Sequence, residues 1–174
     1  MYSIGIFFGS ETGNTKKVAK IIKKKIGKNA NLYNISKINK KKIEKYNILL
    51  FGISTWYYGE PQSDWFNFFP ILKKINFKKK YVGLFGCGDQ EDYSEYFCDA
   101  IKDIYNIIYP LGANIIGYWK NKGYFFEKSK SLLINNKFIG LIIDEDRQPE
   151  LTNIRINKWI KELKIELKKY KIII

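Results

Sequence analysis

The sequence contains no histidine, only two cysteines and no long uncharged apolar run. The absence of histidine removes the usual proton shuttle at neutral pH. Cys87 and Cys98 are the only thiols, which is too few for a disulfide framework. Without histidine they also make a zinc site improbable. No stretch approaches the roughly 18 uncharged apolar residues that span a bilayer, and residues 1–3 lack the basic segment and cleavage site of a signal peptide. We therefore expect a cytoplasmic protein with two ordinary thiols and no membrane partner.

Lysine is also absent from two long stretches, although the chain carries a net charge of +14. The ranges Tyr46–Leu72 and Tyr81–Ile101 contain none. All but two of the 31 basic residues are lysines, and they are concentrated in 16–28, 37–45, 73–80 and 158–171. A charge of this size is typical of nucleic-acid binding, but the distribution favours solvated helix faces. A functional basic surface stays open as the alternative, and we expect no nucleic-acid partner.

Five short apolar runs have the composition of buried strands. They are continuous rather than alternating, which suits parallel strands covered on both faces. Apolar stripes at helical spacing lie after the first run and near the C-terminus, and alternation of strand and helix predicts an open three-layer α/β fold with right-handed crossovers. The strand ranges are Ser3–Phe8, Asn31–Ile35, Asn47–Ile53, Tyr81–Gly86 and Asn114–Trp119, and the stripes are Val18, Ile21, Ile22, Ile26 and Ile156, Ile160, Leu163, Leu167.

One polar tract interrupts this alternation. After Trp119 comes Lys120-Asn121-Lys122-Gly123-Tyr124, and another strand-like run, Lys137–Ile143, precedes the final helix. About twenty residues are therefore expected as an insertion in or beside the last strand. The sequence shows no internal repeat and no linker, so we expect residues 1–174 to form a single domain.

The segment GSETGNT, residues 9–15, follows the first strand run directly and precedes the first helical stripe. Free backbone N–H groups and the helix dipole attract anions at such a junction. In the nucleoside-triphosphatase pattern G-x-x-x-x-G-K-S/T the glycines are one residue further apart, and a lysine stands where this chain has Asn14. Neutral donors without a lysine suit one phosphate monoester. The alternative is an ordinary capped helix with Thr12 as its N-cap.

Two further loops follow the third and fourth strand runs, STWYYGEP (54–61) and CGDQEDYSEYF (87–97). Carboxyl ends of parallel strands share one edge of a sheet, where ligands of open α/β folds bind. Each loop carries aromatic residues, and two of them beside a monophosphate site can sandwich a planar ring. An aromatic sandwich, a monophosphate and surrounding carboxylates describe a site for flavin mononucleotide (FMN).

The motifs GIFFGSETGNT, TWYYGE, LFGCGDQEDYSEYFCDA and GLIIDEDRQPELT together resemble the long-chain flavodoxins of enterobacteria over essentially the whole chain. The resemblance implies a flavodoxin-like sandwich, whose five-stranded parallel sheet in order 2-1-3-4-5 is the order known for flavodoxins themselves. Helices cover both faces, and the insertion splits the last strand. Flavodoxins are usually acidic overall, so the charge of +14 departs from the family.

The resemblance also implies which residues bind FMN. Trp56 and Tyr93 would flank the ring, with Tyr93 the more coplanar, and Glu11 would contact the phosphate through its backbone. Gln90 is expected near the ring as well. The phosphate set is Ser10, Glu11, Thr12, Gly13, Asn14 and Thr15, and the remaining predicted cofactor residues are Thr55, Tyr57, Tyr58, Gly59, Cys87, Gly88, Asp89 and Tyr96.

The implied function is that of a low-potential, one-electron carrier and not an enzyme, because the cofactor carries the chemistry. A unit negative charge about 8 Å from the ring lowers its potential by about 90 mV at an effective dielectric of about 20. Electrons would come from an NADP-dependent flavodoxin reductase and pass to reductively activated enzymes, with the carrier acting as a monomer. These partners would dock on an acidic face made of Glu60, Asp64, Asp89, Glu91, Asp92 and Glu95, extended by Asp99 and Asp144–Asp146.

Two other functions were weighed against a carrier. An FMN-dependent NAD(P)H or quinone reductase would use the same flavin site and stays open as the alternative. A phosphorelay receiver needs clustered acids after the first strand and an aspartate after the third. Gly9-Ser10 and Ser54-Thr55 stand at these positions, which argues against it.

Overall fold

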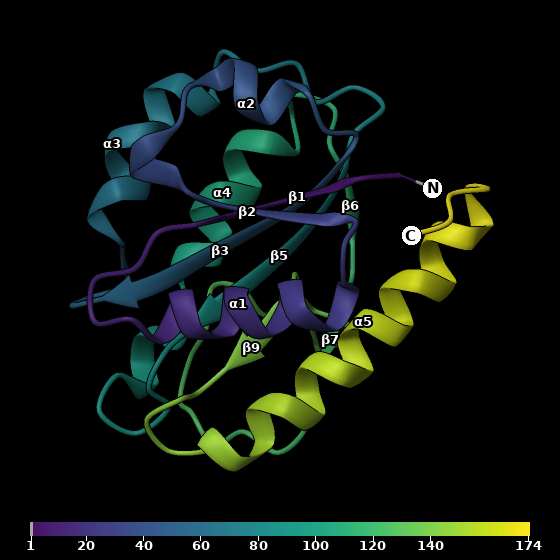
Figure 1. Ribbon diagram of the computed structural model, residues 1–174. Coiled ribbons are helices and arrows are strands. Elements are labelled where there is room, and N and C mark those ends of the chain that lie inside the picture. Colours follow the sequence, from purple (N-terminus) through teal and green to yellow (C-terminus); the bar gives the residue numbers. More distant parts are fainter. Residues whose placement is uncertain (1) are drawn as a thin grey trace.

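The computed structural model describes residues 2–174 and contains a mainly parallel sheet with helices on both faces (Figure 1). Its central strands lie in the order β2-β1-β3-β5-β6. Because β4 is only a two-residue strand beside β3, this order confirms the predicted 2-1-3-4-5 arrangement. The strands are β1 (Ile4–Phe8), β2 (Ala30–Asn34), β3 (Ile48–Trp56), β4 (Glu60–Pro61), β5 (Tyr81–Cys87) and β6 (Asn114–Ile116).

The predicted insertion in the last strand is confirmed by the pairing along β5. Residues Tyr81–Gly83 of β5 pair with β6, whereas Phe85–Cys87 pair with β9 (Leu141–Ile143), and both pairings are parallel. Residues 117–140 therefore leave the sheet after β6, and the chain returns as β9 beside the next residues of the same strand, β5. Within them, β7 (Trp119–Lys120) and β8 (Lys137–Phe138) form a small antiparallel pair.

Three predicted strand ranges were wrong in detail. The run Asn114–Trp119 ends as a sheet strand at Ile116, because Gly117 takes a φ of 76° that turns the chain outward. The run Lys137–Ile143 is divided between β8 and β9. The third strand runs on to Trp56, since β4 turns back and pairs with its end.

The helices divide between the two faces of the sheet (Figure 1). α1 and α5 lie together below the sheet in this view and contact each other, while α2, α3 and α4 lie above it. The α-helices of the described residues are α1 (Asn14–Ile26), α2 (Lys40–Glu44), α3 (Ser63–Leu72), α4 (Ala100–Ile108) and α5 (Thr152–Lys169). None of the helices within residues 2–174 is long and apolar enough to cross a membrane.

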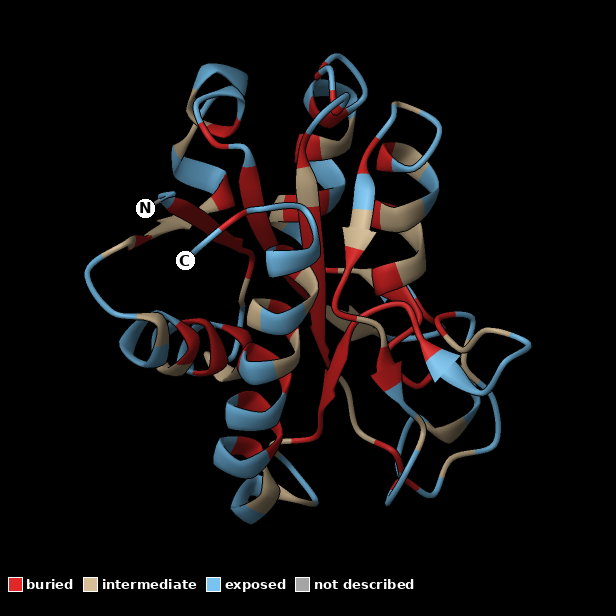
Figure 2. Cartoon of the chain, turned by 90° about the vertical axis from the view of Figure 1, so that its right-hand side faces the viewer, coloured by how far each residue is buried: buried red, intermediate tan, exposed pale blue. Residues whose placement is uncertain are grey.

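Both predicted apolar stripes face the core (Figure 2). Val18 and Ile22 of α1 are fully buried, and so are Ile156, Trp159 and Leu167 of α5. The Trp159 indole N–H also donates to Gly117 O at 2.8 Å, which fixes the point where the insertion leaves the sheet. The central strands β1, β3 and β5 are buried between the two helical layers, as their continuous hydrophobicity predicted, whereas β2 and β6 at the sides of the sheet are only partly buried.

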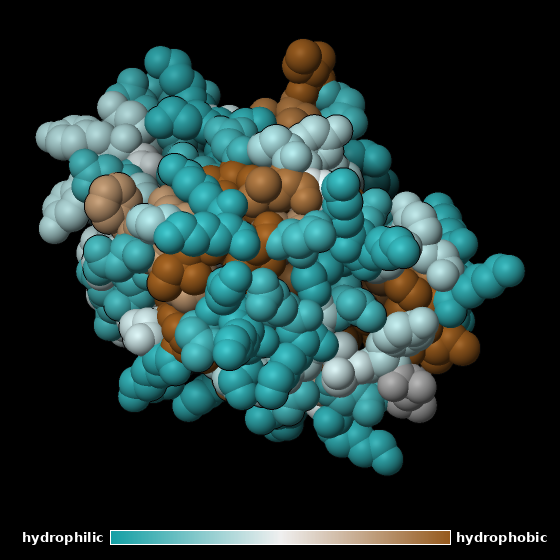
Figure 3. Space-filling model, turned by 90° about the horizontal axis from the view of Figure 1, so that it is seen from above, coloured by the Kyte–Doolittle hydropathy of each residue, from teal (hydrophilic) through white to brown (hydrophobic). Residues whose placement is uncertain are grey.

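Most lysines are exposed, on helices and on loops alike. Hydrophilic side chains cover most of the face seen in Figure 3, around a smaller hydrophobic area near its centre. Lys80 is an exception, with 7% exposure. Its Nζ donates to Glu44 O at 2.9 Å and to Tyr46 O at 2.8 Å, joining the start of β5 to the end of α2. Burial lowers the pKa of Lys80. This lysine is therefore part of the packing and not of the basic surface.

Candidate functional site

Three loops meet at the carboxyl edge of the sheet, where the arrowheads of β3 and β5 point to the lower left in Figure 1. They enclose a cavity of ≈ 370 Å³ to which strands far apart in the sequence contribute. Two of its lining residues, Ser54 and Asp146, were not among the predicted site residues. The predicted residues that line it are Thr12, Asn14, Thr15, Thr55, Trp56, Cys87, Gly88, Asp89 and Tyr93.

The loop after β1 presents unpaired hydrogen-bond donors. Within the described part of the chain, no hydrogen bond is donated by the backbone N–H groups of residues 10–15. Gly13 has a φ of 105° and begins α1 without a side-chain cap, so the alternative of Thr12 as the N-cap was wrong. The Thr15 hydroxyl is buried and also lacks a partner among the described residues. Only the Cys87 thiol interacts with it, and a thiol is a weak donor and acceptor.

Such a cluster of free donors fits an anion. Buried polar groups are nearly always paired, and here the buried Thr15 hydroxyl lies with the unpaired N–H groups at the positive end of a helix dipole. A phosphate monoester supplies enough acceptor oxygens for all of them. The loop can therefore bind a phosphate, and it lacks the side-chain cap of an ordinary capped helix.

Three side chains of this loop are already engaged. Ser10 Oγ accepts from Lys16 N at 3.3 Å, and Glu11 Oε1 accepts from Ser63 N at 3.4 Å. The Asn14 amide donates to both carboxylate oxygens of Asp146, at 3.3 and 3.4 Å. Ser10 still has its O–H to donate, so the donors available to an anion are the backbone N–H groups and the hydroxyls of Ser10 and the two threonines.

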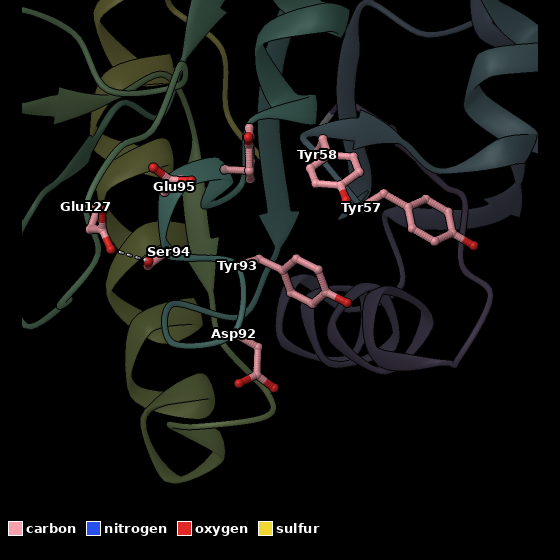
Figure 4. A pocket seen from close by; sticks show the side chains of 8 residues that line it. Tyr57, Tyr58, Asp92, Tyr93, Ser94, Glu95 and Glu127 are labelled. Atoms are coloured by element: carbon pink, nitrogen blue, oxygen red, sulfur yellow. Dashed lines mark hydrogen bonds between the residues drawn. The ribbon is translucent and has the colours of Figure 1, made fainter.

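The aromatic residues lie around the same opening. Trp56 and Tyr93 both line the ≈ 370 Å³ cavity, and the Trp56 indole is oriented by a 3.0 Å hydrogen bond to Ser54 Oγ. An adjacent cavity of ≈ 540 Å³ is lined by Tyr57 and Tyr58 from the turn after β3, and by Tyr93 and Tyr96 from the loop after β5 (Figure 4). The two aromatic loops thus face each other across one opening, as predicted.

The turn of residues 57–59 is tight. Gly59 N donates to Trp56 O at 3.1 Å, and Tyr57 has a φ of 44°, which is rare for a residue with a side chain. Tyr57 and Tyr58 are 63% and 76% exposed, so their rings are available to a ligand or a partner. Backbone strain of this kind concentrates at functional sites.

Some predicted side chains have structural roles. Thr55 Oγ1 accepts from Ala100 N at 3.0 Å at the start of α4, and Gln90 Oε1 accepts from Phe125 N at 2.7 Å in the insertion. The Gln90 side chain is therefore bound to the insertion, and Gln90 is not among the residues that line the two cavities. Both cysteines are free and buried, and burial raises the pKa of Cys87 to about 12, which disfavours a reactive thiolate.

Asp144 joins two of the loops. It was predicted to lie on the acidic docking face, and this prediction was wrong. It is fully buried. Its Oδ2 accepts from Gln90 N at 3.1 Å, and its Oδ1 accepts from Asp146 N at 3.1 Å and Arg147 N at 2.9 Å. A carboxylate with three backbone donors is a stable buried group. Asp144 therefore fixes the loop after β5 against the loop after β9.

The acidic face is also smaller and more compensated than predicted. Asp99 is buried and paired with Lys130, and Glu145 is bound to Lys17 and Thr152. Arg147 lies among the remaining carboxylates and pairs with three of them. Of the predicted docking residues, Glu60, Glu91, Asp92 and Glu95 are exposed, whereas Asp64 and Asp89 are half-buried.

Comparison with known proteins decides the family. The family model described as Flavodoxin matches residues 6–159. A flavodoxin of Buchnera aphidicola subsp. Baizongia pistaciae is 61% identical over 170 residues, covering 96% of this chain and 97% of the relative. Flavodoxin 1 of Escherichia coli K12 is 58% identical over 164 residues, covering 94% and 93%.

The chain belongs to the flavodoxin family. A solved structure of Fusobacterium nucleatum flavodoxin bound to flavin mononucleotide aligns with a TM-score of 0.89 at 35% identity, covering 95% of this chain and 99% of that one. Flavodoxins are electron-transfer flavoproteins rather than enzymes, so the predicted class of function is confirmed. The flavodoxin fold predicted from the sequence is confirmed as well.

The contacts of Asp89 predict how stability depends on pH in this flavodoxin. Burial raises the pKa of Asp89, but the hydrogen bonds from Arg147 and from the N–H groups of Glu91 and Asp92 outweigh burial, so the net pKa lies below its ordinary value. A depressed folded-state pKa contributes stability that is present above the unfolded pKa of about 3.9 and is lost as pH falls through the folded value. We expect Asp89→Asn to lower the urea midpoint at pH 6 and to reduce the fall in that midpoint between pH 5 and pH 3.

Wild-type protein and the variant Asn153→Asp, which adds a carboxylate on the exposed surface of α5, are the controls. Parallel acid limbs for the wild type and Asp89→Asn would contradict this role of Asp89.

Proposed function

We propose that this protein is a low-potential, one-electron carrier that binds FMN non-covalently between the three loops. The observation that carries the proposal is the set of unpaired donors at residues 10–15 together with the buried, unpartnered hydroxyl of Thr15. Hydrogen bonds to a charged acceptor contribute about 1.5–3 kcal/mol each, so several of them suffice without a lysine. The FMN in the Fusobacterium nucleatum structure supports the same ligand here.

The ring of FMN would lie between Trp56 and Tyr93, which line the cavity beyond the phosphate loop. Bound FMN supplies the one-electron chemistry, and the protein supplies position and charge. The turn of residues 57–59 would present backbone groups to the ring edge, and rotation of a peptide there can exchange a donor for an acceptor. Gly59 makes such a rotation inexpensive.

The charge around the cavity supports a low potential. Neither cavity is lined by a lysine or an arginine, whereas Asp89 and Asp146 line the first and Asp92, Glu95 and Glu127 line the second. Added electrons would therefore meet a negative environment, which lowers the potential. The proposal also places the carrier in the cytoplasm as a monomer.

The partners would be an NADP-dependent flavodoxin reductase as the donor and reductively activated enzymes as acceptors. Exposed Glu60, Asp92 and Glu95 beside the opening, together with the absence of lysine from Tyr46–Leu72 and Tyr81–Ile101, support docking of basic partners. The exposed rings of Tyr57 and Tyr58 would lie in the same interface. Charges at such a rim act mainly on association rates.

The proposed function is tested first with the purified protein. We expect a yellow protein, or an apoprotein that takes up FMN at micromolar concentration. Rapid mixing with NADPH alone is expected to leave the flavin absorbance unchanged, and addition of a flavodoxin reductase is expected to bleach it. Rapid bleaching by NADPH alone would support the alternative of an FMN-dependent reductase, and a colourless protein that ignores FMN would overturn the proposal.

Thr15→Val separates binding from stability. The substitution removes a buried hydroxyl without a partner, so we expect the apoprotein to be as stable as the wild type or more stable. Loss of one hydrogen bond to phosphate is expected to weaken FMN binding by about 10-fold to 100-fold. Fluorescence during denaturant titration measures the stability of the apoprotein, and fluorescence during FMN titration measures the affinity. Thr15→Ser, which keeps the hydroxyl, is the control. Riboflavin, which lacks the phosphate, should bind Thr15→Val and wild type equally, and an equal loss for riboflavin would place the hydroxyl outside the phosphate site.

Electrostatic docking predicts a salt dependence. The association rate with a basic reductase should fall as ionic strength rises, because exposed charges are screened beyond a Debye length of about 10 Å at 0.1 M. Asp92→Asn should reduce this slope more than Glu150→Gln, which removes an exposed carboxylate from the short 3-10 turn before α5. Stopped-flow rates between low and high salt measure the slope. A rate that does not respond to salt would contradict docking through the acidic residues.

A further inference from the structure

Arg147 contacts three carboxylates of one short segment. Its Nε lies 3.1 Å from Asp89 Oδ1, its Nη1 lies 3.1 Å from Glu91 Oε2 and its Nη2 lies 2.7 Å from Asp92 Oδ2. Nη2 also donates to Asp89 Oδ2 at 3.1 Å, so the guanidinium holds Asp89 through two nitrogens. Only arginine has a planar fork of donors that can reach three acceptors at once.

The backbone of Arg147 is itself fixed. Arg147 N donates to the buried Asp144 carboxylate, and Gln148 N donates to Asp144 O at 3.1 Å. The guanidinium therefore extends from a well-anchored turn. The segment that it holds, residues 89–92, leads directly to Tyr93, whose N–H donates to Asp89 O at 3.3 Å.

We propose that Arg147 is a positioning residue for the ring site: by holding Asp89, Glu91 and Asp92 together it fixes the segment that carries Tyr93 and offsets part of the negative charge beside the ring. The inference rests on the proposed binding of FMN. Asp89 and Tyr93 line the first cavity, and Asp92 and Tyr93 line the second, so the clamped segment forms one wall of both.

Global stability does not account for the two outer pairs, those of Arg147 with Glu91 and Asp92. The Arg147 side chain is 32% exposed, and Glu91 and Asp92 are 64% and 68% exposed, so the outer pairs are screened by water. Without a cation, however, three carboxylates within four residues repel one another, and the segment would open away from the cavity. The effect of Arg147 is therefore local order and local charge.

Two substitutions separate order from charge. Arg147→Gln removes both the charge and most donors, whereas Arg147→Lys keeps the charge on a single nitrogen that cannot hold three carboxylates in one plane. Lys24→Gln is the matched control, because it removes an equal charge from an exposed position on α1. Lys24 lies outside both cavities of the site.

The measurements are FMN affinity, the midpoint potential of the second electron, and hydrogen–deuterium exchange of residues 89–96 in the apoprotein. For Arg147→Gln we expect FMN affinity to fall roughly fivefold, as for the loss of a few exposed ion pairs. We also expect a more negative second potential and faster exchange. Arg147→Lys should restore the potential but not the exchange protection, and Lys24→Gln should match the wild type in all three.

The outcomes separate the two proposals. A wild-type protein that does not bind FMN overturns the proposed function and this inference together. Wild-type protein that binds FMN, with an Arg147→Gln variant unchanged in potential and exchange, overturns only the role of Arg147. Full recovery of exchange protection in Arg147→Lys would show that charge alone acts, and it would contradict the positioning role.

Discussion

The buried carboxylate of Asp144 is the interaction on which the arrangement of the site depends. It lies at the end of β9 and accepts hydrogen bonds from Gln90 on one loop and from Asp146 and Arg147 on another. An unpaired buried carboxylate would be costly, so its three donors must all be in place. Through this one group, the loop carrying Tyr93 and the turn carrying Arg147 form a single unit.

The split edge strand explains how Asp144 reaches this position. β6 pairs only with the first half of β5, and the chain returns as β9 beside the second half. Asp144 follows β9 directly, so it lies at the carboxyl end of β5, next to the loop that carries Tyr93. The inserted segment also supports the loop after β5 directly, since Lys128 N and Glu127 N donate to Ser94 O and Phe125 N donates to Gln90. The insertion is thus part of the wall of the site.

The fold and the composition of the site could be predicted from the sequence because both depend on local patterns. Continuous apolar runs predicted the strands, and the loops after β1, β3 and β5 were found from their glycines, hydroxyls and aromatic residues. Which side chains of the site are held by other segments could not be predicted, because this depends on contacts between residues far apart in the sequence. Thr55 is bound to the start of α4, Gln90 to the insertion and Asn14 to Asp146. The sequence shows Arg147 directly after the acidic residues Asp144–Asp146. Its contact with Asp89 could not be predicted, because it depends on the return of the chain to the sheet as β9.

Net charge is a poor guide to how this molecule functions, because its positive and negative charges lie in different places. Most lysines of α1, α2 and α5 are exposed, whereas no lysine lines either of the two cavities. At an ionic strength of 0.1 M, charges more than about 10 Å apart across water hardly interact. A ligand in these cavities would therefore respond to Asp89, Asp92 and Asp146, which line them, and to Arg147, which pairs with two of these, and not to the total of +14. A surface rich in lysine and acidic cavities can coexist in one chain for this reason.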